Sequence, residues 1–282
     1  MVPQILLSTA SLYFVSLPQM FRLARQAGFD GLELSPTLRS TSPERIQALA
    51  RETGFPVASL HPPTVPLPGW VRPGNVMRRL AGLARRLPGC RIVVLHFPAV
   101  RSEADPRLAR FYRRLEVLQE GLAGSGIAVA LENRNRRPGE PLGLLDCPAA
   151  WIETGRRLGC GLVLDTSHAS TLPFALLEIY REVRPLLLNI HLSDVRGGGW
   201  WVRFSYPRSI FGQHALPGTG SLPLPALLRE MGQDGYTGLI TLELSPVALR
   251  FWNRPALRAA LQRSLQDCRL WVGKTPETGP PV

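Results

Sequence analysis

Eight short apolar runs alternate with longer amphipathic segments along the 282-residue chain, and this alternation limits the fold more than any other feature. The runs are dominated by Val, Ile, Leu and Ala, without the polar alternation of a strand that has one solvated face. They are therefore predicted to be parallel strands buried on both faces. The predicted strands are Gln4–Ser8, Gly31–Leu34, Pro56–His61, Arg91–His96, Ile127–Glu132, Gly161–Asp165, Leu186–His191 and Leu239–Glu243.

Between these runs, apolar residues recur with the spacing of amphipathic helices. Some of these segments carry a helix-start signal, such as Ser42 followed by Pro43 at the first helical position. The predicted helices are Pro18–Gln26, Pro43–Glu52, Val76–Leu87, Pro106–Leu122, Ala149–Leu158, Leu172–Val183, Leu224–Met231 and Pro255–Val272.

Eight successive strand–helix pairs in a chain of this length favour a closed (β/α)8 TIM barrel, an α/β fold, over an open doubly wound sheet. No Gly-x-Gly-x-x-Gly pattern follows the first run, which argues against a dinucleotide-binding fold. No domain boundary is evident, so residues 1–273 are predicted to form a single barrel domain. The segment 274–282, rich in Pro, Thr and Gly, is predicted to be a flexible tail.

The composition, with 45% hydrophobic and 19% charged residues, is that of a globular protein. No apolar stretch reaches bilayer-spanning length, and the first residues lack a secretory signal pattern. We therefore expect a cytoplasmic protein with no membrane partner. The four cysteines form no Cys-x-x-Cys pair, which argues against a disulfide framework or a thiolate zinc site.

The formal net charge of +12 fits either a polyanionic partner such as DNA or a phosphorylated small molecule. However, Lys274 is the only lysine, and nearly all basic residues are arginines. With the abundant Leu, Pro, Ala and Gly, this is typical of a genome-wide compositional bias, which weakens the charge as an indication of partners.

Side chains that can bind a metal end six consecutive predicted strands. The carboxyl ends of barrel strands converge on one face, so these side chains are expected to meet there. His168 and His214 lie beyond the sixth and seventh strands, and Glu33, near the end of the second, is a candidate substrate ligand. The six strand-end residues are His61, His96, Glu132, Asp165, His191 and Glu243.

Each of these residues alone has an ordinary structural explanation, because a histidine can pack in a loop and an acid can cap a helix. All five histidines together with three acids at one face instead indicate a metal site. Neighbouring carboxylates without a cation would be forced to protonate in part. A mixture of imidazoles and carboxylates favours zinc or manganese, with cobalt, iron or magnesium as alternatives, over calcium.

In their order and spacing, these motifs resemble the xylose isomerase-like TIM-barrel superfamily, which contains sugar and sugar-phosphate isomerases and epimerases and the endonuclease IV type of AP endonucleases. The resemblance implies that Glu132, Asp165, His191 and Glu243 bind the shared metal. It also implies that Glu132 and Glu243 are catalytic, one taking a proton next to a metal-bound carbonyl and the other returning it, while His168 binds a substrate oxygen. The motifs are GFDGLELS, LHPP, VLHFP, LENR, LVLDTSH, IHLSD, HALPGTG and LITLELSP.

In the endonuclease branch, histidines placed like His61 and His96 join the fifth-strand glutamate to bind another zinc. A third zinc there uses the histidine after the sixth-strand aspartate and an Asp-x-His pair. His168 and His214 match that pattern, but Gly212 stands where the aspartate would be. The resemblance thus makes these four histidines candidate ligands of additional metals.

The segment 193–220 is too long for an ordinary barrel loop, and it mixes aromatic residues with arginines. Its Arg196, Trp200, Trp201 and Arg203 are candidate substrate-binding residues, as is Arg134 beyond the fifth strand. Such a segment would serve as a lid over a sugar or phosphate. It would equally stack on bases and meet phosphates, and a structural flap or oligomer contact is a third interpretation.

The predicted function is therefore a divalent-metal-dependent isomerase or epimerase of a small sugar or sugar phosphate. The first alternative is an endonuclease IV-like zinc phosphodiesterase that acts on abasic DNA. The second is a non-catalytic barrel that binds a metal or ligand. The sequence supports no prediction of oligomeric state.

Overall fold

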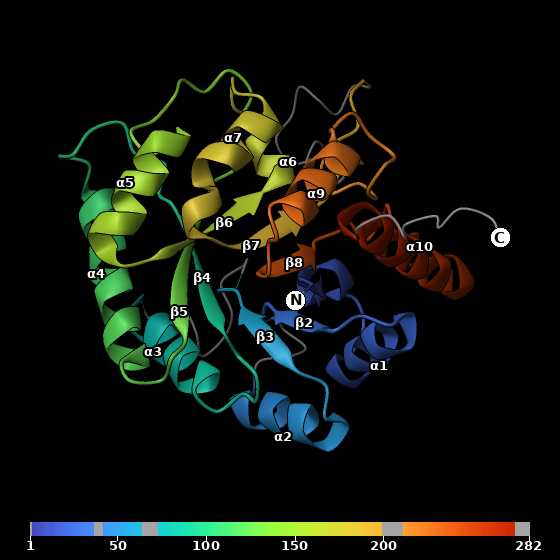
Figure 1. Cartoon of the computed structure of the whole chain (residues 1–282). Helices are drawn as coiled ribbons and strands as arrows, with labels where there is room; N and C mark the ends of the chain where they lie inside the picture. Colours follow the sequence, from blue (N-terminus) through green and yellow to red (C-terminus); the bar gives the residue numbers. More distant parts are fainter. Residues whose placement is uncertain (1, 37–41, 64–72, 199–210, 274–282) are drawn as a thin grey trace.

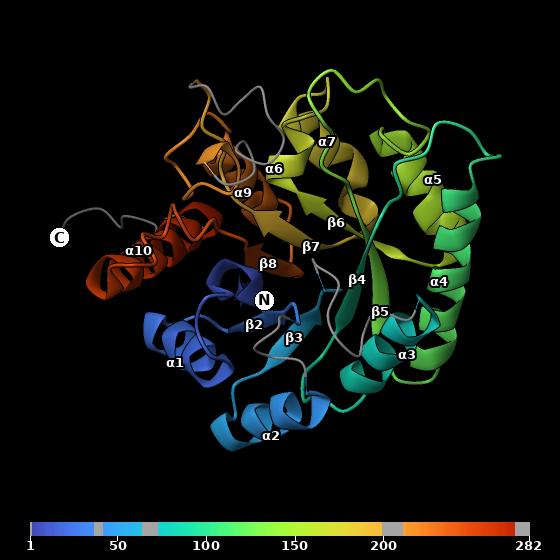
Figure 2. The same ribbon diagram turned by 180° about the vertical axis from the view of Figure 1, so that it is seen from behind.

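The computed structural model describes residues 2–36, 42–63, 73–198 and 211–273. Eight parallel strands pair in sequence order and β8 pairs with β1, which closes the sheet into a barrel surrounded by helices (Figures 1 and 2). This confirms the predicted single-domain (β/α)8 fold. The strands are β1 (Gln4–Ser8), β2 (Gly31–Leu34), β3 (Val57–Leu60), β4 (Ile92–His96), β5 (Ala128–Glu132), β6 (Gly161–Asp165), β7 (Leu187–Leu192) and β8 (Leu239–Leu242).

The helices cover the outside of the barrel, and two of them begin at a capping residue followed by proline. Ser42 and Asp105 each accept a backbone N–H of the following helix, and a proline occupies the first turn of both helices. The helices are α1 (Leu17–Ala27), α2 (Pro43–Thr53), α3 (Pro73–Ala84), α4 (Pro106–Leu122), α5 (Pro148–Leu158), α6 (Thr166–Ala169), α7 (Leu176–Val183), α9 (Leu224–Gln233) and α10 (Arg254–Val272), with 3-10 turns η1 (Thr9–Leu12) and η2 (Arg184–Leu186).

The helix predicted over Leu172–Val183 is wrong at its start, since α7 begins only at Leu176. Pro173 lies in the intervening turns, where it has no N–H to donate to a helix. The separate short helix α6 follows β6 directly, because the Asp165 carboxylate caps it by accepting the His168 N–H.

The strands are buried on both faces, as their apolar composition predicts. A small cluster that includes Leu6, Val94 and Val163 fills the barrel, and a larger one packs the strands against the helices. β3 and β8 end one residue before His61 and Glu243, so these two residues are the first of the loops that follow the strands. The core thus delivers all the predicted strand-end ligands to one face of the barrel.

No helix in the described ranges is long and apolar enough to span a bilayer. The predicted tail 274–282 and the candidate residues Trp200, Trp201 and Arg203 lie outside the described residues.

Two glycines on the packed helices α3 and α4 provide a matched test of the packing. A Cβ at Gly82 would meet no atom within 4 Å, whereas one at Gly121 would lie 2.6 Å from the Ala81 Cβ. Gly82→Ala is expected to raise the free energy of unfolding by about 0.5–1 kcal/mol through helix propensity. Gly121→Ala is expected to lower it by about 1–3 kcal/mol through overpacking. Urea unfolding followed by circular dichroism measures both, and equal stabilisation by the two substitutions would contradict this packing.

Candidate metal centre

Four predicted ligands converge at the carboxyl ends of β5 to β8. The Nδ1 atom of His191 lies 3.2 Å from Glu132 Oε1 and 3.2 Å from Glu243 Oε2. Donor atoms of Glu132, Asp165, His191 and Glu243 all lie within 4.8 Å of one another. One imidazole and three carboxylates at this spacing form a donor set that suits a divalent cation.

An unpaired buried oxygen atom supports the fit to a cation. Asp165 Oδ2 is buried and accepts no hydrogen bond from any described residue. Desolvating a carboxylate oxygen without a partner is costly, and a cation between the carboxylates would remove that cost. The other oxygen of Asp165 accepts the His168 N–H at 2.7 Å, which orients the carboxylate.

His61 and His96 meet the other side of Glu132. Their Nε2 atoms lie 3.5 Å and 3.1 Å from Glu132 Oε2, and 3.4 Å from each other. The His61 Nδ1 lies 2.6 Å from the Pro62 carbonyl oxygen and donates to it, so Nε2 is the ring nitrogen that faces the Glu132 carboxylate. His61, His96 and Glu132 therefore form a second group with metal-binding spacing.

A third group brings together Asp165, His168 and His214, as their sequence positions predict. The His168 Nδ1 lies 2.9 Å from the Asn133 carbonyl oxygen, which leaves its Nε2 for another partner. The His214 Nδ1 lies 3.2 Å from the carbonyl oxygen of Glu243. The group has three donor residues, and Gly212 adds no side chain to it.

Glu33 lies behind His191. Its Oε2 is 2.9 Å from the His191 Nε2 and accepts the Ser59 hydroxyl at 2.7 Å. Hydrogen bonds of this kind orient a ligating histidine and increase its basicity. The structure thus gives Glu33 a positioning contact, and its predicted contact with a substrate stays a prediction.

The packed charges shift the pKa values of the cluster. Burial raises the pKa of Glu132, but the charges of His96 and His191 outweigh it and hold that pKa well below its usual range. Burial lowers the pKa of His61, but the neighbouring Glu132 carboxylate raises it to about 9. Burial likewise lowers the pKa of His191, and the charges of Glu33 and Glu132 raise it well above its usual value. The attraction between these opposite charges therefore offsets the free-energy cost of burying them.

The arginines predicted to bind substrate lie outside the cluster. Arg134 pairs with Asp146 and Glu140, and its Nε donates to Asp146 Oδ1 at 2.8 Å. Arg196 is exposed and donates to the Thr219 hydroxyl at 3.2 Å. Substrate binding by these arginines stays a prediction.

Two buried polar residues, which the sequence did not identify as functional, stabilise the backbone around the site. Asn133 links β5 to β6, because its side chain donates to the Asp165 carbonyl and accepts the Asp165 N–H. The buried Asp194 carboxylate accepts the N–H groups of Val195, Gly220 and Leu222. Asn133 lies in the motif LENR and Asp194 in IHLSD, one and two residues beyond the strand end, and a buried polar residue at such a position was the available signal.

The Asp194 backbone also closes the long segment after β7. Asp194 and Ala215 exchange hydrogen bonds of 3.0 and 2.9 Å in an antiparallel bridge, and Arg196 N–H donates to Gly212 at 2.7 Å. This pairing returns the chain to the barrel and places His214 beside Asp165.

The sequence profile described as xylose isomerase-like TIM barrel matches residues 21–268. The chain belongs to this family. It is 27% identical to an uncharacterised protein of Mycobacterium tuberculosis (strain ATCC 25618 / H37Rv), with 93% of this chain and 95% of that protein covered. It is 25% identical to the 3-dehydro-D-guloside 4-epimerase of Escherichia coli (strain K12), with 80% and 86% covered. The crystal structure of the IOLI protein with a bound zinc atom has a TM-score of 0.69 at 17% identity and covers 95% of this chain and 98% of its own.

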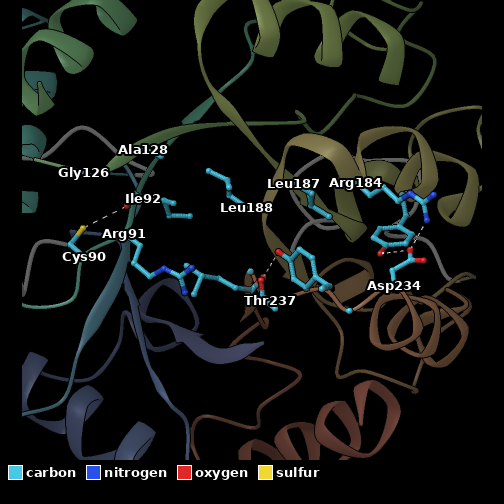
Figure 3. A pocket seen from close by; sticks show the side chains of 15 residues that line it. Cys90, Arg91, Ile92, Gly126, Ala128, Arg184, Leu187, Leu188, Asp234 and Thr237 are labelled. Carbon is cyan, nitrogen blue, oxygen red and sulfur yellow. Dashed lines mark hydrogen bonds and ion pairs between the residues drawn. The ribbon is translucent and has the colours of Figure 1, made fainter. Parts of the chain in front are cut away.

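In this xylose isomerase-like barrel, a cavity of about 750 Å³ lies on the face opposite the metal centre, at the amino-terminal ends of β4, β5, β7 and β8 (Figure 3). The polar groups around it pair with one another. Arg184 and the Tyr180 hydroxyl both contact Asp234, at 2.8 and 3.0 Å, and the Tyr236 hydroxyl donates to the Leu239 carbonyl at 3.0 Å. These contacts tie α7 and η2 to the end of α9 and fix the turn before β8, which is the stabilising role expected of this barrel face.

The contact between Glu33 and His191 predicts the effect of a nearly isosteric substitution. Glu33→Gln removes the negative charge behind the imidazole, so affinity for zinc is expected to fall by about 10- to 100-fold. Competition with a chromophoric chelator measures this affinity. The exposed Glu116→Gln on α4 is the control and should bind zinc like the wild type. If both variants bind zinc equally well, Glu33 does not position His191.

Proposed function

We propose that the protein is a divalent-metal-dependent epimerase or isomerase of a small sugar. The observation that carries the proposal is the pair of carboxylates, Glu132 and Glu243, that approach the same nitrogen of His191 at 3.2 Å. Two bases beside a cation site are what proton removal and return next to a carbonyl require.

Neighbouring histidines favour the ionised form of both carboxylates. Burial raises the pKa of each, but neighbouring histidines outweigh it and lower the pKa, His96 and His191 acting on Glu132 and His191 acting on Glu243. The Glu243 side chain is 19% exposed and that of Glu132 only 1%, so we assign the first proton transfer to Glu243.

In the proposed reaction, a Glu243 oxygen takes the proton from the carbon next to the substrate carbonyl. The electron pair of the broken C–H bond forms a carbon–carbon double bond, and negative charge moves to the carbonyl oxygen. A bound divalent cation supplies positive charge for that oxygen. For inversion at that carbon, Glu132 enters the turnover protonated and gives its proton to the opposite face, and the proton left on Glu243 exchanges with solvent before the next turnover. His168, whose Nδ1 is held by the Asn133 carbonyl, has Nε2 left for a substrate oxygen.

The comparisons support this chemical class. The family match covers most of the chain, and a relative detectable over 80% of it is a sugar 4-epimerase. The zinc atom of the IOLI protein supports zinc as the first metal to test, with manganese as the alternative. The proposed substrate is a small carbohydrate, free or phosphorylated.

Proton exchange in D2O tests the proposal directly. Metal-loaded protein is incubated with ketoses, aldoses, 3-keto-glycosides and their phosphate esters, and NMR follows exchange at the carbon next to the carbonyl. Glu243→Gln and Glu132→Gln are each expected to slow exchange by about 10²- to 10⁴-fold, since an amide does not accept the proton. Glu116→Gln should leave it unchanged. The proposal is wrong if the wild type exchanges no substrate, or if both active-site variants match it.

A second candidate, an endonuclease IV-like zinc phosphodiesterase, is favoured by one observation. Three metal-capable groups lie together, and the four-residue group around His191 shares Glu132 with the second group and Asp165 with the third. Adjacent cations can activate a water and stabilise the leaving oxygen of a phosphodiester. The third group lacks an aspartate at Gly212, which weakens this alternative.

This alternative predicts cleavage of a DNA duplex that carries one abasic site, with two or three zinc ions per chain. His96→Ala should then remove one zinc and reduce cleavage by about 10²-fold or more. Elemental analysis gives the zinc content, and gel electrophoresis gives the cleavage. An intact duplex at high protein concentration, with one metal per chain, would count against it.

A further inference from the structure

A cavity of about 620 Å³ lies beside the metal centre, between the segments that follow β7 and β8 and the first turns of α10. Leu216, Val247 and Ala260 contribute apolar wall, and Arg196, Arg250 and Arg263 each line it from a different segment. None of the described residues that line it is acidic. The cavity therefore has a strongly positive lining.

No described carboxylate forms an ion pair with the arginines of this cavity. Within the described ranges, no ion pair involves Arg196, Arg250 or Arg263. The Arg196 side chain donates to the Thr219 hydroxyl at 3.2 Å. In contrast, Arg184 at the amino-terminal cavity pairs with Asp234. Guanidinium groups around an apolar-walled cavity are suited to bidentate binding of an oxyanion.

Arg250 also has a strained backbone. Its φ is +52°, and among the described residues only His214 shares a positive φ without being glycine. An arginine in this conformation is disfavoured relative to glycine, and such strain concentrates at functional sites. Backbone conformation alone would favour glycine at position 250, so the arginine side chain is expected to have a function of its own.

The cavity and the metal centre share the same two chain segments. Gln213 lines the cavity, and the next residue, His214, belongs to the third metal-capable group. Ser245 N–H donates to the His214 carbonyl at 2.7 Å, and Val247, two residues further, lines the cavity. A ligand that reaches from one site to the other would follow these segments.

We propose that this arginine-lined cavity binds the phosphate group of a phosphorylated sugar whose reacting carbons lie at the metal centre. The substrate assignment rests on the proposed epimerase function, whereas phosphate binding itself can be measured without turnover. Arg250 and Arg263 hold the phosphate oxygens, and Arg196 adds charge from the opposite segment.

Calorimetric titration of inorganic phosphate into the metal-loaded protein tests the site. The double variant Arg250→Gly/Arg263→Gln is expected to bind phosphate about 10- to 100-fold more weakly than the wild type. Glycine relaxes the positive φ at position 250, so the variant should keep its fold, which circular dichroism checks. Arg229→Gln on α9 removes one exposed charge elsewhere and should leave phosphate affinity unchanged.

Phosphate bound only by a metal would have the same affinity for the wild type and the double variant, so equal affinities overturn the proposal. A wild type that binds no phosphate overturns it as well. Where a sugar phosphate turns over, the double variant should lose about tenfold in kcat/KM for it but not for the same sugar without phosphate. Absence of turnover with any sugar overturns the epimerase function and leaves the phosphate result standing.

Discussion

The Glu132 carboxylate lies at the end of β5 with 1% of its side chain exposed, and four histidine rings approach it. His191 and His168 lie 3.2 and 3.5 Å from Oε1, and His96 and His61 lie 3.1 and 3.5 Å from Oε2. A buried carboxylate without such neighbours would be strongly destabilising. Because this one charge is shared, two of the metal-capable groups depend on the same side chain, and the barrel can hold several ionisable groups in its interior.

The segment after β7 supports this arrangement from outside the barrel. Asp194 accepts three backbone N–H groups and its main chain pairs with Ala215, so the chain turns back and His214 reaches Asp165. His214 and Arg250 both adopt a positive φ. One belongs to the third metal-capable group and the other lines the arginine-lined cavity, so the two proposed parts of a substrate would each meet one of these positions.

Much of the fold was predictable because each signal is local. Buried apolar runs locate the strands to within about one residue, and prolines after cap residues mark helix starts such as Pro43 and Pro106. The start of α7 was missed because the periodic pattern continues through Pro173. The positioning contact of Glu33 was also missed. Its partner His191 lies on a strand 158 residues further along the chain, and nothing local to Glu33 identifies that partner.

The sequence by itself determined that five histidines and several acids gather at one face of a parallel barrel. The direction of each strand and the residue at which its apolar run ends can be identified from the local sequence alone. Only the tertiary structure decided which of them meet. Strand register sets His96 opposite Glu132 and Asp165 opposite His191, and the paired ends of the segment after β7 bring in His214. Register in a closed sheet is set by packing around the whole barrel, so the division of these ligands into three groups follows from contacts between residues distant in sequence.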